Sequence, residues 1–223
     1  MGGMMKSTTD TGASPFDPLP DVIDAIANGE MVVVSDDEHR ENEGDLVCAA
    51  EMVTPEKINF MARFGRGLIC VALSTDRLKS LDIRPVRKKG RRDSFNTAFM
   101  DSVDALDNIT TGISAADRAH TIRLLVDDHS GPGDLVSPGH IFPLEAAAGG
   151  VLERLGHTEA AVDLAQLAGL RPAGVICEIL RDDGEMARLP DLVLFAAEHG
   201  LKMTSVADLV RWRKLHEQVL QGV

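Results

Sequence analysis

The sequence Asp36-Asp37-Glu38-His39-Arg40-Glu41-Asn42-Glu43-Gly44-Asp45 lies between two short apolar runs, residues 31–34 and 46–50. Both runs have the length and composition of buried β-strands, so the acidic stretch is predicted to connect two strands of a sheet. It carries six carboxylates in ten residues. Because like charges repel, a folded chain tolerates such a cluster only where water, protons or a cation neutralise it. The stretch is therefore either a solvated loop or a cation site.

Two features favour the cation site over the solvated loop, although a solvated loop is the commoner use of such a composition. The acids contain an arginine, and the stretch adjoins an apolar run that should belong to the core. If the stretch were extended, Glu41, Glu43 and Asp45 would point to one face, and Arg40 and Asn42 to the other. Such a trio of carboxylates could hold a hard divalent metal.

The composition limits the class of protein. A formal net charge of −12 argues against a broad surface for nucleic acid or anionic membrane, because both require clustered Lys and Arg. No apolar run approaches the roughly 20 residues of a membrane span, and the first residues lack the apolar core of a signal peptide. Residues 1–19 are expected to be a flexible tail, and residues 20–223 a single domain of a few layers.

The cysteines and the apolar periodicity indicate a cytoplasmic protein that mixes helices and strands. Three cysteines lie in apolar runs without metal-site spacing, which is typical of reduced thiols: Cys48, Cys70 and Cys177. The patterns predict helices over residues 21–28, 54–64, 75–81, 114–126, 158–168, 190–199 and 205–218. They predict strands over residues 31–34, 46–50, 68–73, 95–103, 173–180 and 202–204.

The helix predicted over residues 158–168 carries Ala and Leu nearly all round, so it should be deeply buried. Thr158 is predicted to cap it. A helix N-terminus exposes unpaired N–H groups, and Arg154 with Gly156 and Thr158 would make a cradle for a phosphate. The simpler alternative is helix capping beside a surface arginine. His157, in the same turn, is a candidate metal ligand.

Three further features could belong to a site. Glu178 lies inside an apolar strand, where a carboxylate must be protonated, paired or directed into a site. His140 precedes the apolar pair at 141–142, where a lone histidine is more often structural than catalytic. The basic run at residues 84–94 is either a solvated loop or a cover that attracts an anionic ligand. Together these residues indicate a metal-dependent enzyme acting on a phosphorylated small molecule.

The chain resembles the 3,4-dihydroxy-2-butanone 4-phosphate synthases of riboflavin biosynthesis. The resemblance covers residues from about 20 to 212. Besides the acidic stretch it rests on Gly65-Arg-Gly-Leu-Ile-Cys70, Thr110-Thr-Gly-Ile-Ser-Ala-Ala-Asp-Arg118, Pro138-Gly-His-Ile-Phe-Pro-Leu144, Arg154-Leu-Gly-His-Thr-Glu-Ala-Ala161 and Pro172-Ala-Gly-Val-Ile-Cys-Glu178. Six long motifs in the family's order make a chance match very improbable.

The resemblance implies an activity and a fold. The reaction is the conversion of D-ribulose 5-phosphate to L-3,4-dihydroxy-2-butanone 4-phosphate and formate, with Mg²⁺, for which Mn²⁺ is a candidate substitute, and with no organic cofactor. The fold is a single three-layer α/β (α+β) domain with a mixed parallel and antiparallel sheet flanked by helices. The resemblance also implies a homodimer whose active sites draw on both subunits.

The resemblance assigns roles to residues of this chain. The implied metal ligands are Glu41 and His157. The implied substrate contacts are Arg40, Glu41, Asp45, Arg154, Gly156, His157, Thr158 and Glu178. The implied catalytic residues are His140 and Glu178, and Glu43 and Asp45 are candidates for proton transfer. These roles also imply that the acidic stretch is a turned segment wrapped around the substrate rather than a regular strand.

Two departures and three alternatives accompany this reading. Residues 96–101 differ from the family's usual pattern, and the basic run before them is unusual. The chain ends without the cysteine cluster of the fused cyclohydrolase relatives, so we expect a monofunctional enzyme. The alternatives are another magnesium-dependent isomerase or aldolase of pentose phosphates, a non-catalytic phosphate-binding protein, and a nucleic-acid-binding protein, which the net charge disfavours.

Overall fold

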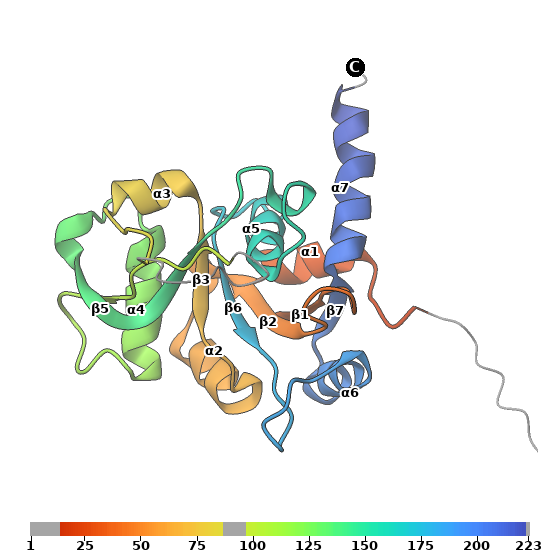
Figure 1. Ribbon diagram of the computed structural model, residues 1–223, viewed down its shortest axis with the longest axis horizontal. Helices are drawn as coiled ribbons and strands as arrows, with labels where there is room; N and C mark the ends of the chain where they lie inside the picture. The colour runs from red at the N-terminus through yellow and green to blue at the C-terminus, as the bar shows by residue number, and fades with distance from the viewer. Residues whose placement is uncertain (1–13, 87–96, 222–223) are drawn as a thin grey trace, which may run out of the picture.

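A computed structural model of the chain describes residues 14–86 and 97–221, with side chains up to residue 216. Within these residues one mixed sheet of seven strands forms the middle layer, and helices cover both of its faces (Figure 1). The strand order is β4-β5-β3-β6-β2-β1-β7. The predicted three-layer α/β fold with a mixed sheet is confirmed.

The sheet combines parallel and antiparallel pairs. β1 pairs in parallel with β7, and β3 in parallel with β5, whereas the other neighbouring pairs are antiparallel. The strands are β1 Val32–Ser35, β2 Gly44–Ala49, β3 Cys70–Leu73, β4 Val103–Ala105, β5 Leu135–Glu145, β6 Gly174–Glu178 and β7 Lys202–Ser205. The antiparallel β1–β2 pair makes the acidic stretch the loop of a hairpin.

The helices form the two outer layers. α1, α5 and α7 pack on one face of the sheet, and α2, α4 and α6 on the other (Figure 1). The helices are α1 Leu19–Ala27, α2 Pro55–Phe60 continued by a π-helical turn Met61–Gly65, α3 Thr75–Ser80, α4 Ala115–Val126, α5 His157–Leu167, α6 Leu189–His199 and α7 Val206–Gln221. Short 3₁₀ turns occur at Ala50–Met52, Pro132–Asp134 and Gly150–Leu152.

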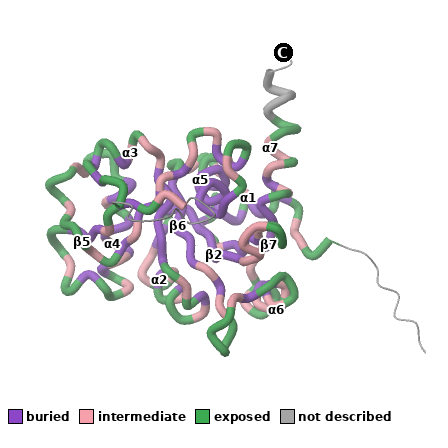
Figure 2. Tube along the Cα trace, in the orientation of Figure 1, coloured by how far each residue is buried: buried purple, intermediate pink, exposed green. Residues whose placement is uncertain are grey.

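The central strands are buried on both faces, which explains why their sequences are apolar without alternation. In β1, Val33 packs in the core beneath α2, α4 and α6, whereas Val32 and Val34 pack in the core beneath α1 and α5. Figure 2 shows the resulting buried centre along β2, β3 and β6. α5 is buried from His157 to Ala165, as its composition predicts.

Three predictions about the fold need correction. Of the strand predicted over residues 95–103, the described part from residue 97 has isolated bridges at Phe99 and Met100, and β4 begins only at Val103. The long strand β5 is absent from the predicted strands, since Pro138 and Gly139 interrupt the pattern of a strand. The N-terminal tail predicted over residues 1–19 is wrong for its last residues, because Asp17 is hydrogen-bonded to Met203 and α1 begins at Leu19.

The tail prediction concerns mainly residues 1–13, which lie outside the described residues. Asp17 already contacts the sheet: its backbone N–H donates to the Met203 carbonyl at 2.8 Å, and its carboxylate accepts the Met203 N–H at 2.8 Å. Lys202 Nζ lies 3.0 Å from the same carboxylate. The chain is therefore hydrogen-bonded to β7 at Asp17, before α1 begins. No helix among the described residues is long and apolar enough to cross a membrane.

Candidate active site

The acidic stretch folds into a turned loop organised by one of its own carboxylates. Asp36 accepts the backbone N–H groups of Glu41 at 3.1 Å and Glu43 at 2.8 Å. Arg40 Nη1 donates to Asp36 at 2.9 Å and to Glu41 at 2.7 Å. Asn42 adopts a left-handed φ of 55°, which reverses the chain. The extended arrangement considered first from the sequence is wrong, and the turned segment is confirmed.

The N-terminus of α5 reaches the same region. Gly156 is the N-cap, and no side chain caps the helix, so the prediction that Thr158 is the cap is wrong. Thr158 lies one residue inside the helix and faces the cavity described below. A Cβ at position 156 would lie 2.6 Å from Arg154 Nη1 and 2.7 Å from Glu159 Oε2. The absence of a side chain at position 156 therefore leaves room for the Arg154 side chain to reach Glu159.

Arg154 is held in place by a buried carboxylate. Its Nη1 donates to Glu159 Oε2 at 2.7 Å, and its Nη2 donates to Thr97 Oγ1 at 3.3 Å. Glu159 is fully buried, and its other oxygen accepts the Ala147 N–H at 3.0 Å. The Arg154 side chain is 22% exposed, and it lines the cavity described below. Such a paired arginine is oriented before any anion arrives.

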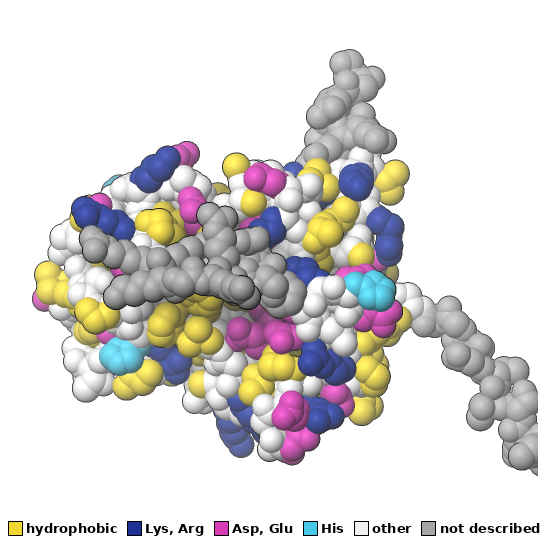
Figure 3. All heavy atoms as spheres, viewed as in Figure 1, with side chains coloured by type: hydrophobic (Ala, Val, Ile, Leu, Met, Phe, Trp, Pro, Cys, Tyr) yellow, Lys and Arg dark blue, Asp and Glu magenta, His cyan; other side chains and the backbone are white. Residues whose placement is uncertain are grey.

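A cavity of about 220 Å³ joins the acidic loop, α5 and β6. Of the predicted site residues, all line it except Gly156 and His140. On the face shown in Figure 3, acidic side chains gather near the middle of the molecule beside apolar ones. The lining residues are Arg40, Glu41, Glu43, Asp45, Cys70, Thr97, Phe99, Leu144, Arg154, His157, Thr158, Ile176 and Glu178.

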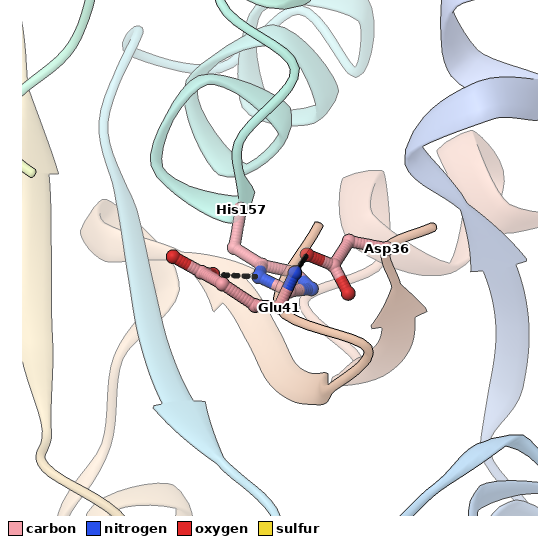
Figure 4. Close-up of side chains that lie close together, drawn as sticks. All are labelled: Asp36, Glu41 and His157. Carbon is pink, nitrogen blue, oxygen red and sulfur yellow. Dashed lines mark hydrogen bonds and ion pairs between the residues drawn. The ribbon is translucent and has the colours of Figure 1, made fainter. Parts of the chain in front are cut away.

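His157 lies at the centre of a cluster of buried charges. Its Nδ1 is 3.8 Å from Glu41 Oε2 and 3.8 Å from Asp45 Oδ1 (Figure 4 shows Glu41 and His157). Burial acts to lower the pKa of His157, but Asp45 and Glu41 outweigh it and raise the pKa above its ordinary value. Burial acts to raise the pKa of Glu41, but His157 and Arg40 hold it below its ordinary value. The contact thus favours the carboxylate form of Glu41 and the protonated form of His157. A cation ligated by His157 would displace that proton.

Two further carboxyls of the cavity, Asp45 and Glu43, hold their protons more tightly than ordinary carboxyls do. Burial raises the pKa of Asp45 to about 7, and Glu178 and Glu43 add to the effect by repulsion. Burial and the charges of Glu41 and Glu178 raise the pKa of Glu43. A carboxyl that exchanges its proton near neutral pH, as Asp45 does, is suited to acid–base chemistry.

Glu178 is brought to the cavity by strand register. It ends β6 directly opposite Asp45 on β2. Its Oε2 accepts the Leu68 N–H at 2.8 Å, and a Cβ at Gly67 would lie 2.5 Å from this oxygen. The backbone of residues 67–68 can approach the carboxylate because position 67 has no side chain. The prediction that Glu178 points into a site agrees with this placement.

The donors in the loop and α5 fit a divalent cation. Asp36, Glu41 and His157 each offer a ligand atom, and these atoms all lie within 4.8 Å of one another (Figure 4). Among the described residues, His157 Nε2 and Asp45 Oδ1 are buried without a hydrogen-bond partner. Buried polar atoms without partners are rare in folded proteins, so a ligand is expected beside them. Carboxylate oxygens with one imidazole suit Mg²⁺ or a similar ion.

His140 lies apart from the cavity. It belongs to β5, its side chain is 43% exposed, and its Nδ1 is 2.7 Å from Asp104 Oδ2. It does not line the cavity of its own chain. The basic run predicted as a cover lies outside the described residues from position 87 onward.

Sequence reasoning did not select several residues that the structure brings to the site. Asp36 shapes the acidic loop, Glu159 holds Arg154, and Cys70 and Thr97 line the cavity. The position of Asp36 directly after a buried strand is a signal that could have found it, because an aspartate there can accept the N–H groups of the following turn. Cys70 and Thr97 carry no comparable local signal.

Comparisons with known proteins identify relatives of this chain. The family model described as 3,4-dihydroxy-2-butanone 4-phosphate synthase matches residues 20–212. A 3,4-dihydroxy-2-butanone 4-phosphate synthase of Agrobacterium fabrum is 55% identical over 196 residues, which cover 88% of this chain and 92% of that protein. The riboflavin biosynthesis protein RibBA of Aquifex aeolicus is 55% identical over 210 residues, which cover 93% of this chain and 52% of that protein.

Solved structures match as well. A crystal structure of 3,4-dihydroxy-2-butanone 4-phosphate synthase in complex with two magnesium ions superposes with a TM-score of 0.87 at 45% identity, over 91% of this chain and 99% of that one. The two-domain RibBX of A. baumannii gives 0.84 at 51% identity, over 88% of this chain and 58% of that one. The chain spans about half the length of the RibBA proteins it matches. With these matches and the motifs of the cavity, this chain belongs to the 3,4-dihydroxy-2-butanone 4-phosphate synthase family.

Proposed function

We propose that this protein converts D-ribulose 5-phosphate to L-3,4-dihydroxy-2-butanone 4-phosphate and formate in riboflavin biosynthesis. The observation that carries the proposal is the cavity itself, where acid–base carboxyls, a candidate cation site and an oriented arginine meet within about 220 Å³. A pentose phosphate requires each of these groups. The arginine would bind its phosphate, the cation would bind its sugar oxygens, and the carboxyls would transfer its protons.

The phosphate would bind at Arg154 and the start of α5. Arg154 supplies a guanidinium that Glu159 already holds in one orientation. Thr158 offers a hydroxyl at the edge of the cavity, and Gly156 allows close approach to the helix N-terminus. Free N–H groups at a helix N-terminus favour an anion. Arg40 and Glu41 would contact the hydroxyl groups of the sugar.

Glu41 and His157 would hold the magnesium ion, and Asp36 is close enough to join them. When bound, Mg²⁺ would supply Lewis-acid polarisation of the ketose oxygens next to carbon 1. Mn²⁺ is expected to substitute, since it accepts the same oxygen and nitrogen donors. No organic cofactor is required in this scheme.

The proton transfers would use carboxyls of the cavity and His140. Asp45 and Glu43, whose pKa values are raised, are candidates for taking the proton from carbon 1. Glu178, on the neighbouring strand, would serve the later loss of water and skeletal shift together with His140. The final step releases carbon 4 as formate.

A second copy of the chain would bring His140 to the site. Within one chain His140 lies on the sheet edge formed by β4 and β5, outside the cavity. Exposed apolar side chains lie on the same part of the fold: Leu106, Ile113 and Val136. We therefore propose a homodimer with shared sites, working in the cytoplasm without nucleic acid or membrane. The net charge and the three buried free thiols support this setting.

A formate assay tests the proposed reaction. Purified protein with ribulose 5-phosphate and Mg²⁺ is expected to release formate, and a chelator should stop the release. Isomerases and aldolases excise no one-carbon unit, and a binding protein has no turnover. Absence of formate in the presence of magnesium or manganese would therefore exclude the synthase assignment.

Mixing inactive variants tests the shared site. His140→Ala and Glu178→Gln are each expected to be inactive alone. If each site takes His140 from one subunit and Glu178 from the other, re-equilibrated equal mixtures should recover about a quarter of the wild-type activity, because half of the dimers carry one intact site. Recovery that stays at zero would contradict the shared site.

A further inference from the structure

The pairing of β4 with β5 breaks directly beside His140. Val103 lies opposite Ile141, but the next residue, Asp104, lies opposite Val136. Residues 137–140 of β5 therefore have no partners in the ladder. Such irregularities redirect side chains and are common next to functional sites.

Asp104 of β4 and Ser102, the residue before β4, take over hydrogen bonds that the ladder lacks. The His140 N–H donates to Asp104 Oδ1 at 2.9 Å, and the Gly139 N–H donates to Ser102 Oγ at 3.2 Å. Ser137 Oγ donates to the Ser102 carbonyl at 2.8 Å. A Cβ at Gly139 would overlap the Val103 backbone, so the segment packs tightly over β4. The bulged segment is thus held in one conformation.

Asp104 also holds the imidazole ring. Its second oxygen, Oδ2, is 2.7 Å from His140 Nδ1, and its carboxylate is buried while the ring is partly exposed. A carboxylate accepts hydrogen bonds only, so Nδ1 carries the hydrogen and Nε2 is left as the nitrogen that can accept or return a proton. One side chain therefore sets both the backbone and the tautomer of His140.

A glycine loop closes over this pair. A Cβ at Gly112 would overlap Asp104 Oδ2 and lie 2.7 Å from His140 Nδ1, and φ at Gly112 is 89°. Asp117 fixes the loop by accepting the Gly112 N–H at 3.1 Å and the Thr110 hydroxyl at 2.7 Å. The backbone at Gly112 therefore packs directly against the Asp104–His140 contact, and a side chain at position 112 would collide with it.

We propose that Asp104 is a positioning residue for the reaction: it holds His140 in the Nδ1–H tautomer, so that Nε2 serves as the acid–base atom offered to the cavity of a second copy. This inference rests on the proposed function. Asp104 acts through His140 and touches no substrate. The preformed pair means that His140 arrives at the neighbouring site already oriented, which is the condition for efficient proton transfer.

The tautomer can be read without any activity. In ¹⁵N-labelled protein, long-range ¹⁵N–¹H spectra above the titration range of histidine distinguish the two tautomers, and His140→Gln identifies the His140 signals. We expect the Nδ1–H form in the wild type and a shift toward Nε2–H in Asp104→Ala. An Nε2–H form in the wild type, or an unchanged tautomer in Asp104→Ala, would overturn the proposal. This result does not depend on formate release.

Kinetics test the catalytic consequence. Asp104→Asn is expected to lower kcat at least about 10- to 100-fold, the range seen for partners that orient metal-bound histidines, with KM nearly unchanged. Asp134→Asn is the matched control, because Asp134 accepts the Gly131 N–H near β5 and contacts no histidine. A rise in KM with unchanged kcat, or equal losses in both variants, would assign Asp104 a structural role only.

Mixed dimers separate positioning from general damage. Asp104→Asn should regain activity when mixed with Glu178→Gln, because each variant lacks a different half of the site. It should gain nothing when mixed with His140→Ala, since both defects lie in the same half. The opposite pattern would overturn the assignment. If the wild type releases no formate, the proposed function fails, whereas the tautomer experiment still decides the role of Asp104.

Discussion

The two histidines of the candidate site differ in how completely the fold satisfies them. His157 is 5% exposed, its Nδ1 lies 3.8 Å from two carboxylates, and its Nε2 has no partner among the described residues. His140 is far more exposed, yet Asp104 binds both its ring and its backbone within 3 Å. The buried histidine is the less satisfied of the two.

This difference shows that the cavity leaves a buried nitrogen of His157 without a hydrogen bond, whereas the β4–β5 edge binds His140 through Asp104. Leaving a buried polar atom without a hydrogen bond costs about 1–3 kcal/mol, so a ligand beside His157 Nε2 would remove that cost. In the function we propose, a cation would occupy the place beside His157. Asp104 already binds the ring and the backbone N–H of His140 within the single chain, as our proposal of a preformed pair requires.

The largest expected effect comes from Glu178, the carboxylate that faces Asp45. Glu178→Gln keeps the shape and the contact with the Leu68 N–H but cannot carry a proton. We expect kcat to fall by roughly 10²–10⁴ with near-normal substrate binding, measured by formate release and isothermal titration. Glu185→Gln, an exposed carboxyl in the following turn, is the control. Full activity of Glu178→Gln would assign the residue to structure.

Magnesium binding tests the contrast between the two histidines directly. We expect Mg²⁺ to raise the Tm of the wild type. At a hundredfold excess of Mg²⁺ over its Kd, the free energy of unfolding should increase by about 2.7 kcal/mol. Glu41→Gln and His157→Gln should lose this response, whereas His140→Gln should keep it, as followed by calorimetry. A magnesium response that survives in His157→Gln would remove His157 from the cation site.

Glu159 should affect substrate affinity more than turnover. Glu159→Gln keeps the side-chain volume but weakens the charge-assisted hydrogen bond that orients Arg154. We expect KM to rise about tenfold, equivalent to about 1.4 kcal/mol, with a smaller change in kcat. Glu153→Gln, on the exposed turn before Arg154, should leave KM unchanged. Equal KM values for the two variants would contradict the role of Glu159.

The smallest effect concerns Asp117, which fixes the loop over His140. The hydrogen bond from the Thr110 hydroxyl, with the backbone N–H groups of Thr110 and Gly112, outweighs burial and lowers the pKa of Asp117 below its ordinary 3.8. A lowered pKa in the folded state stabilises the protein above the unfolded value, and this contribution is lost as the pH falls through the folded value.

Asp117→Asn should therefore be less stable than the wild type at pH 7, with a difference that shrinks below about pH 4. Urea unfolding of both proteins from pH 7 to pH 3 measures the difference. Asp134→Asn serves as a control for removing an aspartate that lies away from this loop. A difference that stays constant over this range would show that the charge of Asp117 does not contribute.

Much of the local structure could be predicted because it depends on neighbouring residues. Apolar runs predicted β1, β2, β3 and β6, and helical periodicity predicted α1, α4 and α6. The predicted bounds lie within a few residues of the observed ones. Pro138 and Gly139 hid β5, since both residues usually interrupt strands. The cap of α5 was misassigned because Gly156 leaves its N–H groups free, whereas Thr158 has the residue type that usually caps a helix.

The sequence by itself determined which chemical groups are available: the acidic stretch, the Arg154–Thr158 turn and Glu178 lie in short motifs whose composition already indicates a cation, an anion and a proton carrier. The tertiary structure decided how they meet. The β2–β6 register places Glu178 opposite Asp45, and the irregular β4–β5 pairing sets Asp104 against His140, outside the cavity. Long connections rather than tight turns join the strands of each pair, so no turn signal in the sequence reveals their register.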